Sequence, residues 1–190
     1  MNYDIIPLPR GKWQGQILPI GYTTERFYDV RITREGNNFT VTLCECIADP
    51  PITHTPEEYD YPDSLYQEHW KDASAWGIVA DGKLLAAIET CPEEWSNRLR
   101  ITELWVDASI RHQGVGHALI ALAKEQAKRE QRRALILETQ SCNHNAIGFY
   151  LHEGFSLIGF DACCYANNDI ARHEVRIELG ILYDKPESGT

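Results

Sequence analysis

The sequence of 190 residues contains no apolar stretch near the roughly 20 residues that a membrane-spanning helix needs. Its start, Met1 to Pro7, lacks the basic region and the apolar run of a signal peptide. The six cysteines form no CxxC pair, and the seven histidines add no tight Cys/His cluster of the kind that binds zinc. These absences predict a cytoplasmic protein with free thiols and no metal site.

Basic residues are also scarce, because 18 Lys and Arg stand against 28 Asp and Glu, giving a net charge of −10. An acidic surface repels nucleic acid and attracts cations. Carboxylates are dense between Cys44 and Asp72, and four aromatic residues lie among them: Tyr59, Tyr61, Tyr66 and Trp70. The segment is either an ordinary solvated surface or the wall of a site for a polycationic substrate, with rings available for cation–π contact.

The length fits a single structural domain. We expect residues 1–75 to form an N-terminal extension and first elements on the acceptor side, and residues 76–190 to form the core. The patterning predicts strands at 27–32, 39–46, 76–80, 83–90, 99–106, 134–139, 155–162 and 174–182, and helices at 63–73, 114–131 and 143–152. Asp49-Pro50-Pro51 should interrupt any regular element. The strand–helix–strand order in the second half requires a partly parallel sheet with helices on its faces, an α/β (α+β) fold.

A glycine-containing turn precedes the long expected helix: Arg111-His112-Gln113-Gly114-Val115-Gly116. Glycine lets a backbone approach a ligand closely, and a helix N-terminus presents unpaired N–H groups to an anion. The turn is not a Walker A loop, because no Gly-Lys-Ser/Thr follows, and it lacks the third glycine of a dinucleotide-binding fingerprint. By itself it indicates a pyrophosphate site or simply a tight turn.

A second motif lies downstream, where the strand at 134–139 is followed by Asn143-His144-Asn145-Ala146-Ile147-Gly148-Phe149-Tyr150 and then by Gly154-Phe155. Together the two motifs resemble the Gcn5-related N-acetyltransferase (GNAT) family from about Trp76 to Leu182, and the first 75 residues match it poorly. The resemblance implies a central mixed, mostly antiparallel, twisted sheet with a parallel β-α-β core and helices on both faces. It also implies acetyl-CoA as cosubstrate and a primary amine as acceptor.

The resemblance assigns roles to individual positions. The pantetheine arm of acetyl-CoA would pair with the backbone of Leu104, Trp105 and Val106. The pyrophosphate would meet the turn formed by Arg111, His112, Gln113, Gly114, Val115 and Gly116. Asn143, or else Asn145, would contact the cofactor, although Asn143 also suits a helix cap. Tyr150 would be the general acid that protonates the leaving thiolate.

Glu103 is the candidate base, because a substrate ammonium with a pKa of about 10.4 must lose a proton before it attacks. We expect Glu103 to lie between Ile101 and Trp105 on one strand face, where partial desolvation raises the pKa of a carboxyl. Glu138 is the second choice, and a chain of waters is a third way to remove the proton. Three further residues, Tyr165, Asn167 and Asn168, would either line the acceptor site or build a turn.

Shorter strings, among them Leu137 to Gln140 and Cys164 to Asn168, resemble the subgroup of this family that acetylates the β-lysine amine of streptothricin antibiotics. A protein lysine, an N-terminus or a polyamine is the alternative acceptor. A non-catalytic acyl-CoA-binding regulatory module is the alternative of a different class, against which Tyr150 and Glu103 argue. No nucleic-acid or membrane partner is expected, and the sequence leaves open a homodimer.

Overall fold

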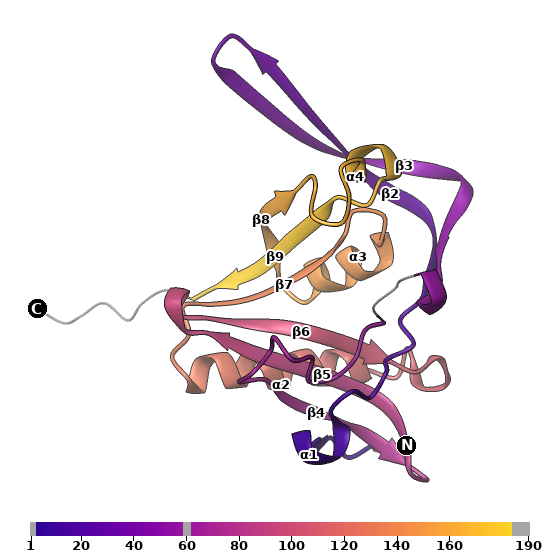
Figure 1. Cartoon of the computed structure of the whole chain (residues 1–190), viewed down its shortest axis with the longest axis vertical. Helices are drawn as coiled ribbons and strands as arrows, with labels where there is room; N and C mark the ends of the chain where they lie inside the picture. Colours follow the sequence, from indigo (N-terminus) through magenta and orange to yellow (C-terminus); the bar gives the residue numbers. More distant parts are fainter. Residues whose placement is uncertain (1–2, 59–61, 184–190) are drawn as a thin grey trace, which may run out of the picture. The chain divides into compact units, whose positions relative to one another are not determined.

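A computed structural model describes residues 3–58 and 62–183, and the chain forms two compact units (Figure 1). Unit one consists of Met1–Ile20, Pro56–Leu137 and Ile181–Thr190. Unit two consists of Gly21–Thr55 and Glu138–Gly180. No helix in the described part of the chain is long and apolar enough to cross a membrane.

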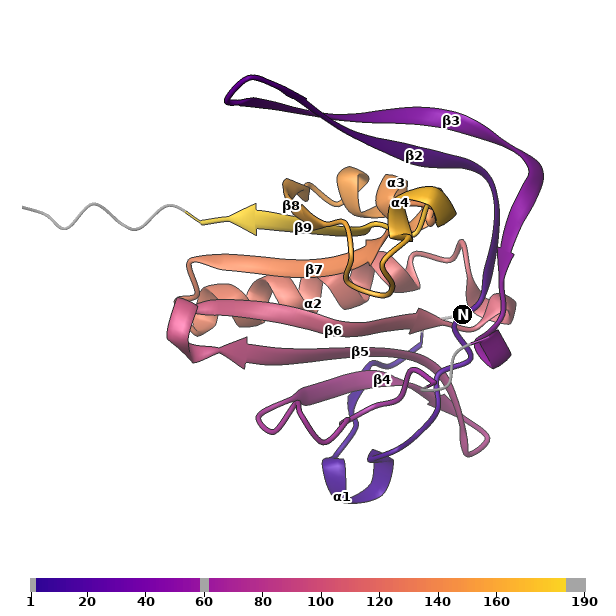
Figure 2. The same cartoon turned by 45° about the horizontal axis from the view of Figure 1, so that its top comes forward.

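Unit one is built on a sheet with the strand order β1-β4-β5-β6-β7. The strands are β1 (Ile6–Pro7), β4 (Ser74–Ala80), β5 (Lys83–Glu93), β6 (Arg98–Val106) and β7 (Ala134–Gln140), the last of which begins in this unit. The pairs β1/β4, β4/β5 and β5/β6 are antiparallel, whereas β6 and β7 are parallel. Helix α2 (Val115–Arg129) makes the crossover between the two parallel strands and packs against β5 and β6 (Figure 2).

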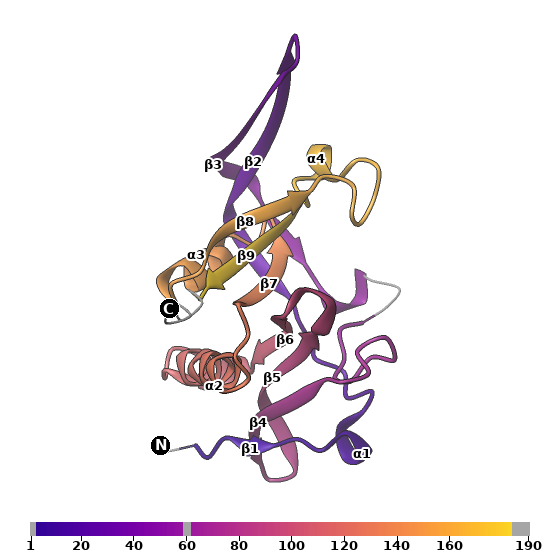
Figure 3. The same cartoon turned by 90° about the vertical axis from the view of Figure 1, so that its left-hand side faces the viewer.

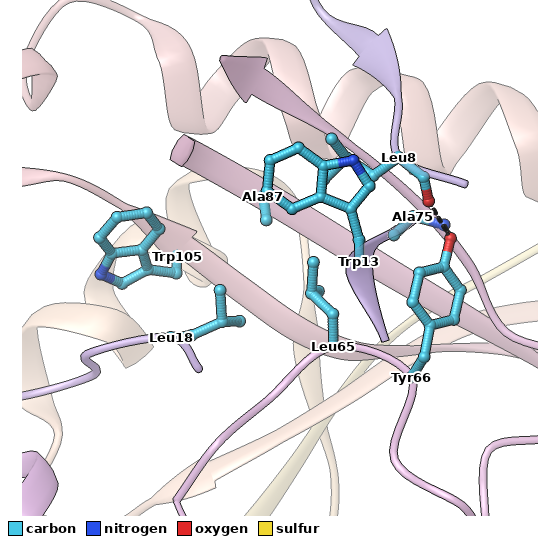
Figure 4. Close-up of a cluster of buried hydrophobic side chains, with 8 residues drawn as sticks. All are labelled: Leu8, Trp13, Leu18, Leu65, Tyr66, Ala75, Ala87 and Trp105. Atoms are coloured by element: carbon cyan, nitrogen blue, oxygen red, sulfur yellow. Dashed lines mark hydrogen bonds between the residues drawn. The ribbon is translucent and has the colours of Figure 1, made fainter. Parts of the chain in front are cut away.

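The two faces of this sheet have different covers. On the α2 face, the Thr90 hydroxyl donates to Gln126 Oε1 of the helix at 2.9 Å. In Figure 3, β1 and the short helix α1 (Arg10–Trp13) lie beside β4. A cluster of eight buried residues joins this N-terminal segment to the sheet (Figure 4): Leu8, Trp13, Leu18, Leu65, Tyr66, Ala75, Ala87 and Trp105. The N-terminal extension is therefore part of the core of unit one.

Unit two contains a long antiparallel hairpin of β2 (Tyr22–Glu35) and β3 (Asn38–His54). It also contains helix α3 (His144–His152), strand β8 (Ser156–Asp161), helix α4 (Asp169–Arg172) and most of strand β9 (Arg176–Leu182), which pairs with β8 in antiparallel fashion. Both α3 and α4 contact β2.

The fold class expected from the sequence is confirmed: the sheet is mixed and mostly antiparallel, with one parallel β-α-β connection. Turn and cap residues in the sequence predicted the ends of several elements correctly. Asp81 and Gly82 have φ values of 50° and 76°, as the tight turn between β4 and β5 requires. Asn143 caps α3 with its side chain, and Gly154 follows the helix with a φ of 89°.

The helix expected at 63–73 is wrong. The backbone of this segment bonds to the N-terminal segment instead, with Leu65 N–H donating to Gln16 O and Leu18 N–H donating to Asp63 O. Tyr66 has a φ of 60°, a left-handed conformation that no α-helix contains. Burial of Leu65 and Tyr66 in the cluster outweighs the local helix signal.

Two further features of unit two differ from expectation. Strand β3 runs on through Pro50 and Pro51, but its pairing with β2 jumps from Ile47 to Ile52, so the prolines interrupt the ladder and not the extended chain. Helix α4 was not expected, because its four residues are too short for a periodic signal.

Candidate active site

The turn before α2 has the geometry of an anion site. Gly114 has φ 80° and ψ 2°, and α2 begins at the next residue. The first intrahelical bond runs from Ala118 N–H to Gly114 O at 3.0 Å, so the N–H groups of residues 115–117 precede it. Gly114 has no side chain to cap them, and the first turn of α2 contains no acidic residue. This arrangement fits a pyrophosphate, because N–H groups and the helix dipole both attract negative charge.

Side chains around the turn tie it to the end of β6. Arg111 Nε donates to Val106 O at 2.9 Å, so the side chain of this turn residue is bonded to the last residue of β6. Gln113 Nε2 donates to Ser109 O at 3.3 Å, and His112 takes a φ of 60°. Asp107 accepts from Ser109 N–H at 2.9 Å, which fixes the short 3-10 turn that precedes the site.

Strand β6 has a long stretch beyond its parallel neighbour. Its ladder with β7 pairs Arg98 with Ala134 and ends at Arg100 with Ile136. On the other side, pairing with β5 continues to Val106. Residues 101–106 therefore lie beyond the parallel ladder, and this stretch contains Leu104, Trp105 and Val106. An extended ligand arm can hydrogen-bond to such a strand edge in the manner of an added strand.

A β-bulge in β6 corrects the expected orientation of Glu103. Glu89 is paired with Glu103, but the next residue, Thr90, is paired with Ile101, so Thr102 is an extra residue. Paired residues project to the same face of a sheet. Ile101 therefore shares the α2 face with Thr90, whereas Glu103 shares the opposite face with Glu89. The expectation that Ile101, Glu103 and Trp105 share one face is wrong for Ile101.

Glu89 is a buried carboxylate that was not predicted from the sequence. Its side chain is fully buried, Oε2 accepts from Tyr66 N–H at 2.5 Å, and Oε1 accepts from the Thr102 hydroxyl at 2.8 Å. Burial raises the pKa of this carboxyl, against the opposing effects of these two hydrogen bonds and of Arg10 and His69. One carboxylate thus holds both the bulge of β6 and the loop at Tyr66. The sequence did contain a signal for this buried carboxylate, because Glu89 is a glutamate within the apolar run of the strand expected at 83–90.

The acidic, aromatic segment between Cys44 and Asp72 belongs partly to unit two and partly to unit one. Glu45 and Asp49 lie on β3 in unit two, and Tyr59 to Tyr61 lie outside the described residues. Tyr66 is 3% exposed, and the Arg10 guanidinium lies 4.6 Å from its ring centroid. The cation that contacts this ring is therefore Arg10 of the same chain, and not a substrate.

In unit two, Asn143 accepts from Ala146 N–H at 3.2 Å as the cap of α3. The next residue, His144, contacts two residues of the β2–β3 hairpin. Its Nε2 lies 3.3 Å from Glu45 Oε2, and its ring is stacked on that of Tyr28 with 5.6 Å between the ring centroids. Glu45 also bonds to Arg26. Tyr28 N–H donates to Ser141 O at 2.9 Å, so the hairpin fixes the backbone that leads into Asn143.

Tyr150 and Glu138 also lie in unit two. Tyr150 is 9% exposed, its ring packs edge-on against Phe155 at 5.8 Å, and it comes from the buried stripe of α3. Glu138 Oε2 forms an ion pair with Arg176 Nη2 at 2.5 Å.

The residues after β8 form a turn. Asp169 accepts from Tyr165 N–H at 2.9 Å and from Ala166 N–H at 2.7 Å, and Asn168 precedes α4 as its N-cap residue without a side-chain cap bond. Tyr165 is 44% exposed. Unit one contains β6, Glu103 and the turn at 111–116, and unit two contains Asn143, Tyr150 and this loop.

Three features, namely the mixed sheet, the edge of β6 beyond its ladder with β7 and the glycine turn before α2, are those expected of an acyl-CoA-dependent transferase. The model of the acetyltransferase (GNAT) family matches residues 42–155, more than half of the chain, and the chain belongs to this family. It is therefore an N-acetyltransferase with acetyl-CoA as its cosubstrate.

Among curated proteins, a streptothricin acetyltransferase of Streptomyces lavendulae is 29% identical over 147 residues, covering 76% of each chain. One from Escherichia coli is 34% identical over 95 residues, covering 50% of this chain and 54% of the relative. The crystal structure of a nourseothricin acetyltransferase superposes with a TM-score of 0.72 at 25% identity, covering 96% of this chain and 99% of that one. A putative streptothricin acetyltransferase from Bacillus anthracis, solved with acetyl coenzyme A, has the same fold at 22% identity, a TM-score of 0.71 and coverage of 97% and 100%.

Proposed function

We propose that this enzyme transfers acetyl from acetyl-CoA to a primary amine of a small cationic acceptor, the β-lysine amine of streptothricin-class antibiotics, and so confers resistance by modification. Two relatives with 29% and 34% sequence identity to this chain are streptothricin acetyltransferases, which supports this acceptor. Such an acceptor suits a chain with a net charge of −10.

The extent of the structural match supports this acceptor best. The nourseothricin acetyltransferase covers 96% of the chain, so it includes most of residues 1–75. A ribosomal-protein-S18-alanine N-acetyltransferase, which has the family fold at a TM-score of 0.55, covers only 70%. Three residues of the N-terminal part, Leu8, Trp13 and Leu18, belong to the buried cluster of unit one.

We assign the steps as follows. Glu103 accepts a proton from the substrate ammonium, directly or through water, and the neutral amine attacks the thioester carbonyl. The C–S bond then breaks, the acetyl group stays on the amine nitrogen, and Tyr150 donates its phenolic proton to the departing thiolate. The acetylated nitrogen loses its second proton to solvent, and the Tyr150 phenolate regains a proton from solvent. The backbone of residues 104–106 pairs with the pantetheine arm, the turn at 111–116 binds the pyrophosphate, and Asn143 bonds to the cofactor.

A thiol-release assay with acetyl-CoA and a panel of amines tests the acceptor. We expect turnover with streptothricin at a kcat/KM well above that for a lysine peptide, an N-terminal peptide or spermidine. Turnover of the peptide or the polyamine without turnover of streptothricin would replace this acceptor with the alternative one. Mass spectrometry of the product locates the acetyl group on the β-lysine amine or elsewhere.

Two variants test the assigned roles. Tyr150→Phe keeps the ring packing against Phe155 and removes the proton donor, so kcat should fall on the order of 10²-fold. Glu103→Gln should lower kcat at neutral pH and recover partly at high pH, where the free amine no longer needs a base. A wild-type rate for Tyr150→Phe near neutral pH would remove Tyr150 from the mechanism.

A further inference from the structure

The sequence contains one pair of adjacent cysteines, Cys163 and Cys164, in the loop that connects β8 to α4 (Figure 3). All six cysteines are free thiols, but only these two are exposed, whereas the other four are buried or partly covered. The adjacent pair therefore offers the most accessible thiols of the chain, and the steps assigned to acetyl transfer use neither of them.

Both sulfur atoms contact the same cross-strand pair of residues. Asp161, the last residue of β8, is paired with Arg176, the first residue of β9, so their side chains share one face of the sheet. Cys163 Sγ donates to Asp161 Oδ1 at 3.5 Å, and Arg176 Nη1 donates to Cys164 Sγ, also at 3.5 Å. Adjacent side chains of an extended strand project to opposite faces, whereas these two thiols converge on one face.

The loop around the two thiols is held by hydrogen bonds within unit two. Cys163 N–H donates to Asp161 Oδ1 at 3.0 Å, which turns the chain at the end of β8. Beyond the pair, the fully buried Asp169 carboxylate accepts from the N–H groups of Tyr165 and Ala166. The backbone on both sides of the thiols is therefore fixed, so little conformational entropy is lost when a ligand bridges them.

A ligand atom that binds two sulfurs suits this pair better than a direct disulfide does. The Cα atoms of adjacent residues are about 3.8 Å apart across a trans peptide, which is below the range of about 4.4–6.8 Å usual for disulfides. Among the residues that the structure describes, no group of three or more His, Cys, Asp or Glu side chains is placed to hold a metal ion. The trivalent arsenic of an organoarsenical needs only two sulfur ligands besides its carbon, in a bent arrangement that adjacent cysteines can provide.

The carboxylate next to Cys163 favours the same chemistry. The hydrogen bond to Asp161 raises the pKa of the Cys163 thiol, and the negative charge of Asp161 acts in the same direction. A protonated thiol reacts poorly with oxidants such as peroxide, for which the thiolate is the reactive form. In the reaction with an arsine oxide, by contrast, the thiol protons are needed, because they leave with the arsenic-bound oxygen as water.

We propose that Cys163 and Cys164 form a dithiol site that binds one trivalent organoarsenical by bridging both sulfurs. With phenylarsine oxide, the bond between arsenic and oxygen breaks, two As–S bonds form, and both thiol protons leave with the oxygen as one water. Arsenic stays trivalent, so the step needs no oxidant or reductant. The site is independent of the proposed acetyl transfer, because none of the residues assigned to that reaction takes part.

Phenylarsine oxide, added to the reduced and folded full chain, tests the proposal by intact-mass spectrometry. We expect one adduct whose mass gain equals one phenylarsine oxide less one water, and a fall in free thiols from six to four because two are consumed. The adduct should survive an excess of a monothiol and be removed by dimercaptopropanol, since a dithiol replaces both As–S bonds together. Cys163→Ser and Cys164→Ser should each raise the apparent dissociation constant on the order of 10²-fold, because the second, intramolecular bond is lost.

The other close pair of cysteines provides a matched control. Cys44 and Cys46 lie two positions apart on β3, so their side chains share a face and their Cα atoms are about 6.6 Å apart. Cys44→Ser should retain the wild-type adduct and affinity, and circular dichroism with thermal melting shows whether each variant is folded. A wild type without a monothiol-resistant adduct overturns the proposal, and so does a resistant adduct that persists in both Cys163→Ser and Cys164→Ser. Loss of the adduct in Cys44→Ser would assign it to β3 and overturn the proposal as well.

Discussion

Replacement of Glu89 gives a sharp test, because two substitutions of the same buried residue should differ widely. In Glu89→Ala, the donors at Tyr66 N–H and Thr102 Oγ1 lose their acceptors in a fully buried place. Each unsatisfied buried donor costs about 1–3 kcal/mol, so the variant should lose roughly 2–6 kcal/mol of its free energy of unfolding. Total stabilities are about 5–15 kcal/mol, so this is a large share.

In Glu89→Gln both contacts can be kept. The amide oxygen can accept from Tyr66 N–H, and the amide NH₂ can donate to the Thr102 hydroxyl, which turns to accept. The variant also removes the cost of a charged carboxylate in a buried place. We therefore expect its unfolding free energy to lie within about 1 kcal/mol of the wild type at neutral pH.

The pH dependence adds an independent measure. The folded pKa of Glu89 is raised above its usual value of 4.5. Such a group stabilises the fold fully below the unfolded pKa and loses that contribution as pH rises through the folded pKa. The stability of the wild type relative to Glu89→Gln should therefore decline as pH increases from about 4.5 and then level off.

The assay is urea denaturation followed by circular dichroism at several pH values, with wild type, Glu89→Ala and Glu89→Gln side by side. Thr102→Val serves as a control that removes one of the two donors, and its loss should be non-additive with Glu89→Ala. An unfolding free energy of Glu89→Ala within about 1 kcal/mol of the wild type would contradict the role given to this carboxylate, and so would a Glu89→Gln variant as unstable as Glu89→Ala.

Three further predictions concern the turn, the hairpin base and the sheet. Gly114→Asp should raise the acetyl-CoA dissociation constant at least tenfold by calorimetry, because φ at this position is 80° and a carboxylate there repels pyrophosphate; Gly114→Ala should weaken binding less, and equal affinities would remove the turn from the site. Glu45→Gln should loosen the start of α3 and raise the KM for acetyl-CoA a few-fold, whereas Arg31→Ala, which breaks an exposed ion pair on the same hairpin, should leave KM unchanged. Gly77→Ala should lower the melting temperature sharply, since its Cβ would lie 2.2 Å from Ala86 O; a melting curve like that of the wild type would show that β4 and β5 can separate there.

Local backbone features that depend on a few adjacent residues could be predicted from the sequence. Asp81-Gly82 specified a turn, Gly114 specified the left-handed residue before α2, and Asn143 specified a helix cap, because each property belongs to a few adjacent residues. The two motifs around these residues were also enough to indicate the family, which the match over residues 42–155 confirms.

Tertiary structure alone decided the orientation of Glu103 and the course of residues 63–73. A single extra residue in β6, Thr102, reverses which face the following side chains share, and only pairing with β5 reveals it. Tyr66 leaves helical geometry because its N–H bonds to Glu89, a residue 23 positions away, and because burial outweighs local propensity. Such contacts depend on which segments meet in space, and no local pattern of residues contains that information.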